Sequence, residues 1–143
     1  MKFSHKTSVA LRFSDMDSFG HVNNACFLTY FEEARIKYID DIVGWKYGWA
    51  KTGIILAHSE TDFLIPVNFK DIILIKTCCS KIGTKSFTML HQMLKIESEK
   101  EVPVSTAATV VVMYDYENNC SIPVNEAWKI AIKKYEFESG NAI

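Results

Sequence analysis

The chain has 143 residues, of which 48% are hydrophobic and 23% are charged, and its formal net charge is −1. This length favours one domain, spanning 1–143, with a core large enough to fold without disulfides or metal ions. The near-neutral charge argues against a protein whose main task is to grip nucleic acid or an anionic membrane, because such binding needs a concentrated positive field. No stretch approaches ~18 consecutive apolar residues, so no membrane span is expected.

The four cysteines, Cys26, Cys78, Cys79 and Cys120, match no zinc or redox spacing. Reduced thiols are the simplest account of them. The first six residues are polar and lack the apolar core of a secretory signal. We therefore expect a cytoplasmic protein.

The N-terminal part of the chain alternates and then turns polar. Val9, Leu11 and Phe13 fall on one side of a strand predicted over 7–13. Residues 14–22 are rich in Ser, Asp and Gly, which predicts a loop.

From about Asn24 the apolar residues follow helical spacing and predict one long helix. Asn23 or Asn24 is suited to cap its first turn. Gly44 and Gly48 bracket the break that follows it. The apolar positions of the helix are Phe27, Leu28, Phe31, Ala34, Tyr38, Ile39 and Ile42, and the break contains Trp45, Tyr47 and Trp49.

Four apolar, β-branched segments come next, with a hairpin-like turn at 81–83. They predict strands over roughly 54–65, 71–79, 85–97 and 102–114. Residues 115–121 are polar and turn-like, and Pro123 suits the first turn of a closing helix.

The predicted order, one strand, one helix, four strands and one helix, lacks the alternating βα units of a doubly wound sheet. It favours an α+β fold in which a mostly antiparallel five-stranded sheet curls around one long helix, with a second helix at the C-terminus. Such a sheet leaves an exposed edge, so we expect a homodimer or homotetramer that covers it.

The segment richest in chemical groups is DMDSFGHVNN, residues 15–24. It places Asp15, Asp17 and His21 just before a helix N-terminus, where free amides and the positive end of the dipole can polarise a carbonyl oxygen. A carboxylate there is suited to attack an acyl carbon or to take a proton from water. The alternative is ordinary capping and turn chemistry, which Asp-rich loops commonly serve.

The run continues as FLTYFEEAR over residues 27–35, and the whole resembles the signature of the 4-hydroxybenzoyl-CoA thioesterase family, whose members have the hotdog fold. The resemblance implies a thioesterase that hydrolyses an acyl-CoA thioester and needs no cofactor or metal, coenzyme A being part of the substrate. It implies that Asp17 is the catalytic nucleophile or general base and that Asp15 shapes the loop. Phe27 stands where the family usually has Tyr.

The resemblance also suggests which residues line the substrate pocket: Gly20, His21, Asn23, Asn24 and Phe27, with Ser59 and Glu60 as candidates on the strand beside it. For Glu33 and Arg35 we expect an ion pair or hydrogen bonds to the loop. Lys70, Lys81 and Lys85 are candidates for the phosphates of coenzyme A. Two alternatives stay open: a thioesterase for acyl-carrier-protein substrates, and a module of the same fold that binds acyl-CoA without cleaving it.

Overall fold

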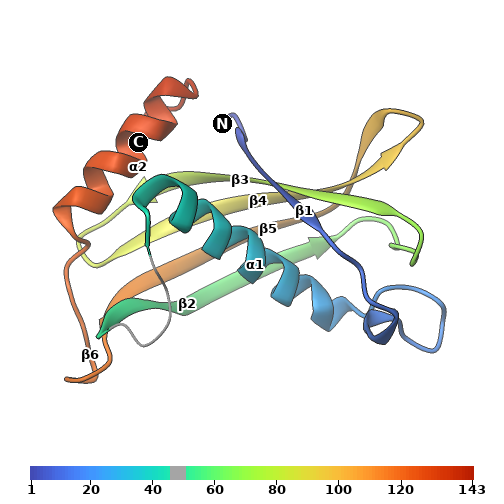
Figure 1. The fold of residues 1–143 in the computed structure, drawn as a ribbon, viewed down its shortest axis with the longest axis horizontal. Helices are drawn as coiled ribbons and strands as arrows, with labels where there is room; N and C mark the ends of the chain where they lie inside the picture. The colour runs from blue at the N-terminus through green and yellow to red at the C-terminus, as the bar shows by residue number, and fades with distance from the viewer. Residues whose placement is uncertain (46–50) are drawn as a thin grey trace.

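The computed structural model describes residues 1–45 and 51–143. Within them the chain forms one antiparallel sheet and two long helices (Figure 1). The strand order across the sheet is β1-β3-β4-β5-β2, and a short strand, β6, pairs with β5. The strands are β1 (His5–Val9), β2 (Thr52–Phe63), β3 (Ile72–Ile82), β4 (Ser86–Glu97), β5 (Lys100–Asp115) and β6 (Cys120–Ser121).

Helix α1 (Asn24–Val43) lies across the concave face of this sheet (Figure 1). Its buried stripe repeats at helical spacing and therefore faces the sheet along the full length of the helix. Gly44 ends it with a φ of 65°, the left-handed conformation that glycine adopts at little cost. The buried residues of α1 are Phe27, Tyr30, Phe31, Ala34, Arg35, Tyr38 and Ile39.

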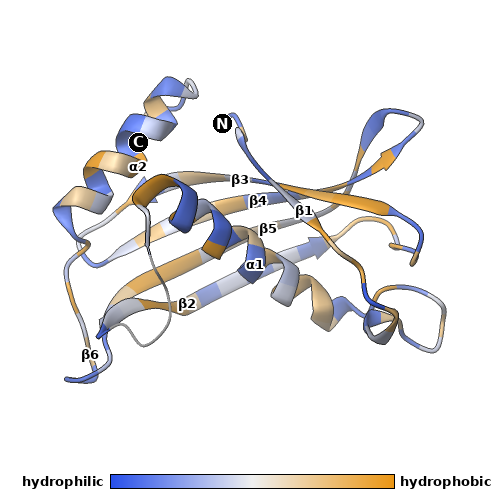
Figure 2. Cartoon of the chain, in the orientation of Figure 1, coloured by the Kyte–Doolittle hydropathy of each residue, from blue (hydrophilic) through white to orange (hydrophobic). Residues whose placement is uncertain are grey.

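The sheet buries the face turned toward α1. Figure 2 shows long hydrophobic stretches along the strands, whereas hydrophobic and hydrophilic residues are mixed along the two helices. In β4 the inward side chains alternate as predicted: Phe87, Met89, His91 and Met93 are all buried. His91 lies between two hydroxyls, 3.0 Å from Thr77 Oγ1 and 3.1 Å from Thr109 Oγ1.

Helix α2 (Glu126–Glu138) is attached to the sheet and to α1 through the fully buried Glu136. The Glu136 carboxylate accepts hydrogen bonds from the Tyr38 hydroxyl at 2.6 Å, the Cys79 amide at 2.7 Å and the Asn141 side chain at 2.6 Å. Three donors replace the water that this carboxylate loses on burial. Asn141 also bonds the backbone of Lys2, so the two chain ends lie together.

The fold class is as predicted, but three details differ. β1 ends at Val9, and Phe13 is 81% exposed on a 3-10 turn, η1 (Phe13–Asp15), because the chain leaves the sheet there. A sixth strand, β6, forms in the predicted turn region. α2 begins at Glu126, capped by Asn125 rather than opened by Pro123. Tyr47, Gly48 and Trp49 lie outside the described residues.

The buried His91 predicts an acid-sensitive fold. Burial, aided by the charge of Arg35, lowers the pKa of His91 from its ordinary value of 6.5 to about 3. Between these values the unfolded chain takes up a proton at His91 that the folded chain does not. The free energy of unfolding therefore falls as the pH is lowered through this window, by at most about 1.4 kcal/mol per pH unit from this group.

His91→Gln removes this contribution, so its unfolding free energy, measured by urea denaturation from pH 6.5 to 4, declines less steeply than that of the wild type. His58→Gln is the control, since His58 is exposed on β2. Equal slopes in the two variants would contradict the assignment.

Candidate active site

The loop between η1 and α1 is a tight turn pinned at both ends. Met16 and Val22 form an isolated antiparallel bridge, and inside it the amide of Asp17 donates to the carbonyl of His21 at 2.8 Å. The amide of Val22 donates to the carbonyl of Val67, which joins the loop to the segment after β2. These backbone bonds fix the course of the loop between the sheet and the helix.

Asp17 stands at the base of this turn with one carboxylate oxygen engaged. Its Oδ1 accepts from the backbone amides of Phe19 at 2.8 Å and His21 at 3.3 Å. Gly20 has a φ of 84°, in the left-handed region that favours glycine, and lets the chain reverse between those two amides. The two amide bonds set the direction of the carboxylate while Oδ2 is left for other contacts.

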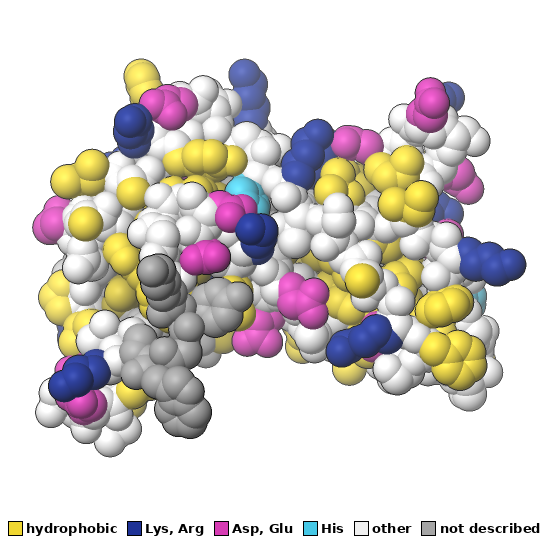
Figure 3. All heavy atoms as spheres, viewed as in Figure 1, with side chains coloured by type: hydrophobic (Ala, Val, Ile, Leu, Met, Phe, Trp, Pro, Cys, Tyr) yellow, Lys and Arg dark blue, Asp and Glu magenta, His cyan; other side chains and the backbone are white. Residues whose placement is uncertain are grey.

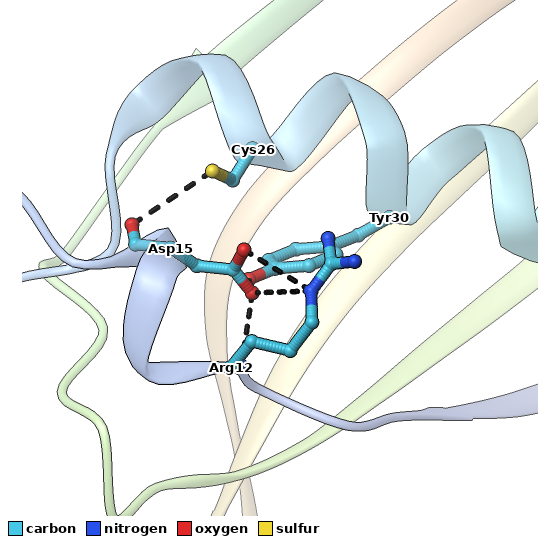
Figure 4. A network of polar contacts seen from close by, with 4 residues as sticks. All are labelled: Arg12, Asp15, Cys26 and Tyr30. Atoms are coloured by element: carbon cyan, nitrogen blue, oxygen red, sulfur yellow. Dashed lines mark hydrogen bonds and ion pairs between the residues drawn. The ribbon is translucent and has the colours of Figure 1, made fainter.

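Asp15, two residues earlier, is 3% exposed and holds the loop to the helix (Figure 4). Its Oδ2 accepts from the hydroxyl of Tyr30 at 2.6 Å and from the amide of Arg12 at 2.9 Å, and the guanidinium of Arg12 lies 3.3 Å from Oδ1. Its backbone carbonyl accepts from the amide of Asn23 at 2.8 Å. Burial alone raises the pKa of Asp15, but the bonds from Tyr30 and Arg12 outweigh it and hold that pKa below its ordinary value.

Asp17 lines a pocket of about 260 Å³ whose walls are mostly apolar. Phe27 and Phe63 meet edge to face there, with ring centroids 5.1 Å apart. Asn24 is the first residue of α1 and also lines this pocket, so the positive end of the helix dipole lies beside it. The pocket is lined by Asp17, His21, Val22, Asn24, Phe27, Phe63, Leu64, Ile65, Pro66 and Val67.

A second hollow continues from this pocket along the groove between α1 and β2. It shares Asn24 and Phe63 with the first and adds Ser59 and Thr61 of β2 and Leu28 of α1. The two together form an open groove that starts at Asp17 and runs between helix and edge strand. Apolar walls with a few polar groups are typical of sites for small organic ligands.

A β-bulge at Ala57 decides which side chains of β2 face this groove. The register shifts between Leu56 and His58, after which Ser59 pairs with the buried Thr109 and Glu60 with Ala108. Successive side chains on a strand point to opposite faces, so Ser59 turns toward α1 and Glu60 away from it. Glu60 lines a different hollow, with Asp62 and Gln92. Glu60 is therefore not among the residues that line the Asp17 pocket or the hollow beside it, and its expected contact with substrate stays a prediction.

The other predicted residues divide between structure and surface. Asn23 is the N-cap of α1, its side chain accepting from the amide of Ala25 at 2.9 Å. Arg35 is buried, and its guanidinium lies 3.8 Å from the carboxylate of Glu32 rather than pairing with the exposed Glu33. The charge of Glu33 acts instead on Arg12, the partner of Asp15.

The three candidate lysines are widely separated. Lys70 follows the segment that lines the Asp17 pocket. Lys81 and Lys85 flank the β3–β4 turn, at the opposite end of the sheet, and Lys85 donates to Ser121 at 3.1 Å. Within one chain, Lys70 alone of these three lies at the Asp17 end.

Sequence reasoning missed the second wall of the pocket. Phe63, Leu64 and Val67 come from the end of β2 and the segment after it, and no motif marks them. Their signal is weak: an apolar run with Pro66 after a polar strand. The ring centroids of Phe13 and Phe69 lie 6.0 Å apart at this end of the molecule, and Phe19 is 83% exposed. Hydrophobic side chains are therefore present on the surface here (Figure 3).

Neither α1 nor α2 is long and apolar enough to cross a membrane. In 1–45 and 51–143, no three His, Cys, Asp or Glu side chains lie together as metal ligands would.

Comparison with known proteins identifies the family. The YsmA protein of Bacillus subtilis is 31% identical over 120 residues, which covers 84% of this chain and 79% of that protein. The long-chain acyl-CoA thioesterase FadM of Escherichia coli is 24% identical over 107 residues, covering 74% and 80%. A thioesterase from Thermus thermophilus, solved with coenzyme A and Zn, is 28% identical with a TM-score of 0.79, covering 96% of each chain.

The model of the thioesterase-like superfamily matches residues 11–134, which includes the Asp17 loop, both walls of the groove and most of α2. The resemblance seen in residues 15–35 thus extends over nearly the whole chain. The curled sheet and its two helices are those of the hotdog thioesterases, as the motif implied. On the shared family and fold, this chain belongs to the thioesterase-like superfamily and is a thioester hydrolase of the hotdog fold.

Proposed function

We propose that the chain hydrolyses an acyl-CoA thioester to a free acid and coenzyme A, with the carboxylate of Asp17 as nucleophile or general base. The observation that supports this most is the position of Asp17. Its carboxylate is oriented by the amides of Phe19 and His21 at the mouth of an apolar pocket, beside the N-terminus of α1. Coenzyme A bound to the Thermus relative and the activity named for FadM support the choice of substrate class.

The proposed reaction needs only groups present at this mouth. As a general base, Asp17 takes a proton from water while the water oxygen bonds to the thioester carbon; as a nucleophile, Asp17 bonds to that carbon first and water then releases the acid. In both routes the C–S bond breaks, and the sulfur leaves as the thiolate of coenzyme A and takes up a proton. The helix N-terminus at Asn24 stabilises the negative charge that develops on the carbonyl oxygen.

The groove supports an assignment of the substrate parts. The acyl group would lie against Phe27 and Phe63 and extend toward Ser59 and Thr61. Phe27 offers no hydroxyl to a polar acyl group, which favours apolar acids. Of the candidate lysines, Lys70 is the one that a single chain brings to this end, so it would meet the phosphates of coenzyme A. A cytoplasmic location is part of the proposal, supported by four cysteines that are all unpaired.

The test is a panel of thioesters assayed with a thiol reagent. Straight-chain acyl-CoAs of rising length and aromatic acyl-CoAs are compared with the same acyl groups on an acyl carrier protein. Cys120 is exposed and would itself react, so its signal is subtracted or removed with Cys120→Ser. We expect release of coenzyme A. Binding of acyl-CoA without release would contradict the proposal. Cleavage of the carrier-protein substrates alone would show instead that the chain is an acyl-carrier-protein thioesterase.

The role of Asp17 has its own test in the same assay. Asp17→Asn keeps the shape and the acceptor for the two amides, yet removes the charge, so kcat should fall on the order of 10²-fold or more. Asp62→Asn is the matched control, because Asp62 is exposed on the outer face of β2 and lies in a different hollow. A near wild-type rate for Asp17→Asn would refute the mechanism while leaving the enzyme class intact.

We also propose that two chains pair along β2. This strand is 12 residues long and stands at the open edge of the sheet, where its backbone groups lack a neighbour on one side. Ile55 and Leu56 on this strand are 38% and 47% exposed. Exposure of this apolar surface to water is unfavourable, and pairing of two chains would bury it. The Asp17 groove runs between β2 and α1, so a partner at this edge would help to close it.

Light scattering after size-exclusion chromatography measures this pairing. We expect a dimer or a tetramer of the wild type, and monomers of Ile55→Lys/Leu56→Lys, because two charges on the edge strand oppose association. Ile130→Lys replaces a similarly apolar residue that is 67% exposed on α2 and should leave the assembly unchanged. A monomeric wild type at assay concentration would contradict the proposal.

A further inference from the structure

Two tyrosines of α1 make the same kind of bond at different places. Tyr30 and Tyr38 are 1% and 0% exposed, and each donates its hydroxyl to a buried carboxylate at 2.6 Å. Tyr38 reaches Glu136 and so holds α2. Tyr30 reaches Asp15 and so holds the turn from which the Asp17 loop departs (Figure 4).

The bond from Tyr30 acts close to Asp17 along the backbone. Asp15 and Asp17 are separated by one residue, Met16, which takes part in the bridge that closes the loop. The carbonyl of Asp15 accepts from the amide of Asn23, so the same residue also fixes where α1 begins. A shift of Asp15 would therefore move Asp17 and the helix N-terminus relative to each other.

We propose that Tyr30 is a positioning residue for Asp17: its bond to Asp15 locks the loop against α1 and holds the Asp17 carboxylate in place beside the helix N-terminus. The inference rests on the proposed function, in which Asp17 carries the chemistry. Tyr30 itself faces Asp15 and not the groove, since it is absent from the residues that line either hollow.

The charges around Asp15 make the pH dependence of kcat a second readout. A merely structural role of Tyr30 would leave this pH dependence unchanged. The charged or titratable groups that act on this carboxylate or on its partners are Tyr30, Arg12 and Cys26, with Glu33 acting on Arg12. Burial and the bond to Asp15 raise the pKa of Tyr30, so its hydroxyl stays a donor throughout the working range. Without that donor the pKa of Asp15 rises, and the lock releases at a higher pH.

The experiment compares Tyr30→Phe with Tyr38→Phe, which lose one equivalent hydrogen bond each. On a thioester that the wild type cleaves, Tyr30→Phe should lower kcat about tenfold with KM nearly constant, because a small displacement of a reacting group costs rate rather than affinity. The acid limb of its kcat profile should move to higher pH. Tyr38→Phe should lose a similar amount of thermal stability, yet keep kcat within about twofold of the wild type and the acid limb in place.

A second measurement does not depend on turnover. The amides of Phe19 and His21 bond to Asp17, so their hydrogen exchange by NMR reports the loop directly. Tyr30→Phe should speed their exchange more than about fivefold and Tyr38→Phe should not. If Tyr30→Phe does not fold, Arg12→Gln weakens the same lock from an exposed side chain and should move both readouts in the same direction, by less.

The outcomes separate the two proposals. An inactive wild type overturns the proposed function, and an active Asp17→Asn overturns the role of Asp17 within it. In either case the exchange rates decide whether Tyr30 holds the loop. An active wild type with Tyr30→Phe equal to Tyr38→Phe in kcat, acid limb and exchange overturns the positioning role alone.

Discussion

The apolar stripe of α1 is buried because the sheet curves around the helix. The arrangement of the other elements follows from this contact between helix and sheet. A flat sheet would touch the helix along a line, whereas the curled one buries Phe27 at one end of the stripe and Ile39 at the other. The curvature also sets what the ends of α1 can reach. Its first turn meets the loop after η1, and its later turns meet α2 through Glu136.

Three buried polar side chains, Asp15, His91 and Glu136, are arranged along this contact. Asp15 and Glu136 each lie at one part of α1, and each is satisfied by a tyrosine of the helix together with backbone amides. His91 lies between them, held by two threonine hydroxyls. A buried polar group is costly unless its partners are in place, so these three sites favour one position of the helix over the neighbouring ones.

The candidate site is what this contact leaves at its open end. The helix N-terminus, the Asp17 turn and the end of β2 converge where the sheet no longer covers α1. Rigid backbone on two sides and an open groove on the third give a place where a carboxylate and a helix dipole face the same small volume. The exposed edge of β2 borders that groove, so assembly and catalysis are linked through one strand in the function that we propose.

Much of the fold was accessible from residue patterns. The alternation in 85–97 and the helical spacing from Asn24 reflect the burial of one face of each element. Because each element shows this pattern in its own contiguous residues, the pattern can be recognised from the sequence. The motif at 15–24 identified the loop, and Asp15 has the loop-shaping role expected of it. The errors fall where a local pattern competes with the rest of the molecule, as at Phe13, whose alternation predicts a strand. β1 pairs with β3 only as far as Val9, opposite Ile73 near the start of β3, so the chain beyond Val9 has no strand beside it to extend the sheet.

By itself the sequence determined the family, the order of the elements, and the loop that carries Asp17, because each of these is encoded in contiguous residues. The tertiary structure alone decided how distant residues share one site. It placed Phe63 and Val67 opposite Asp17, turned Ser59 inward and Glu60 outward through the bulge at Ala57, and set Tyr30 on Asp15. These relations depend on register and on the packing of α1, and neither is visible until the chain is folded.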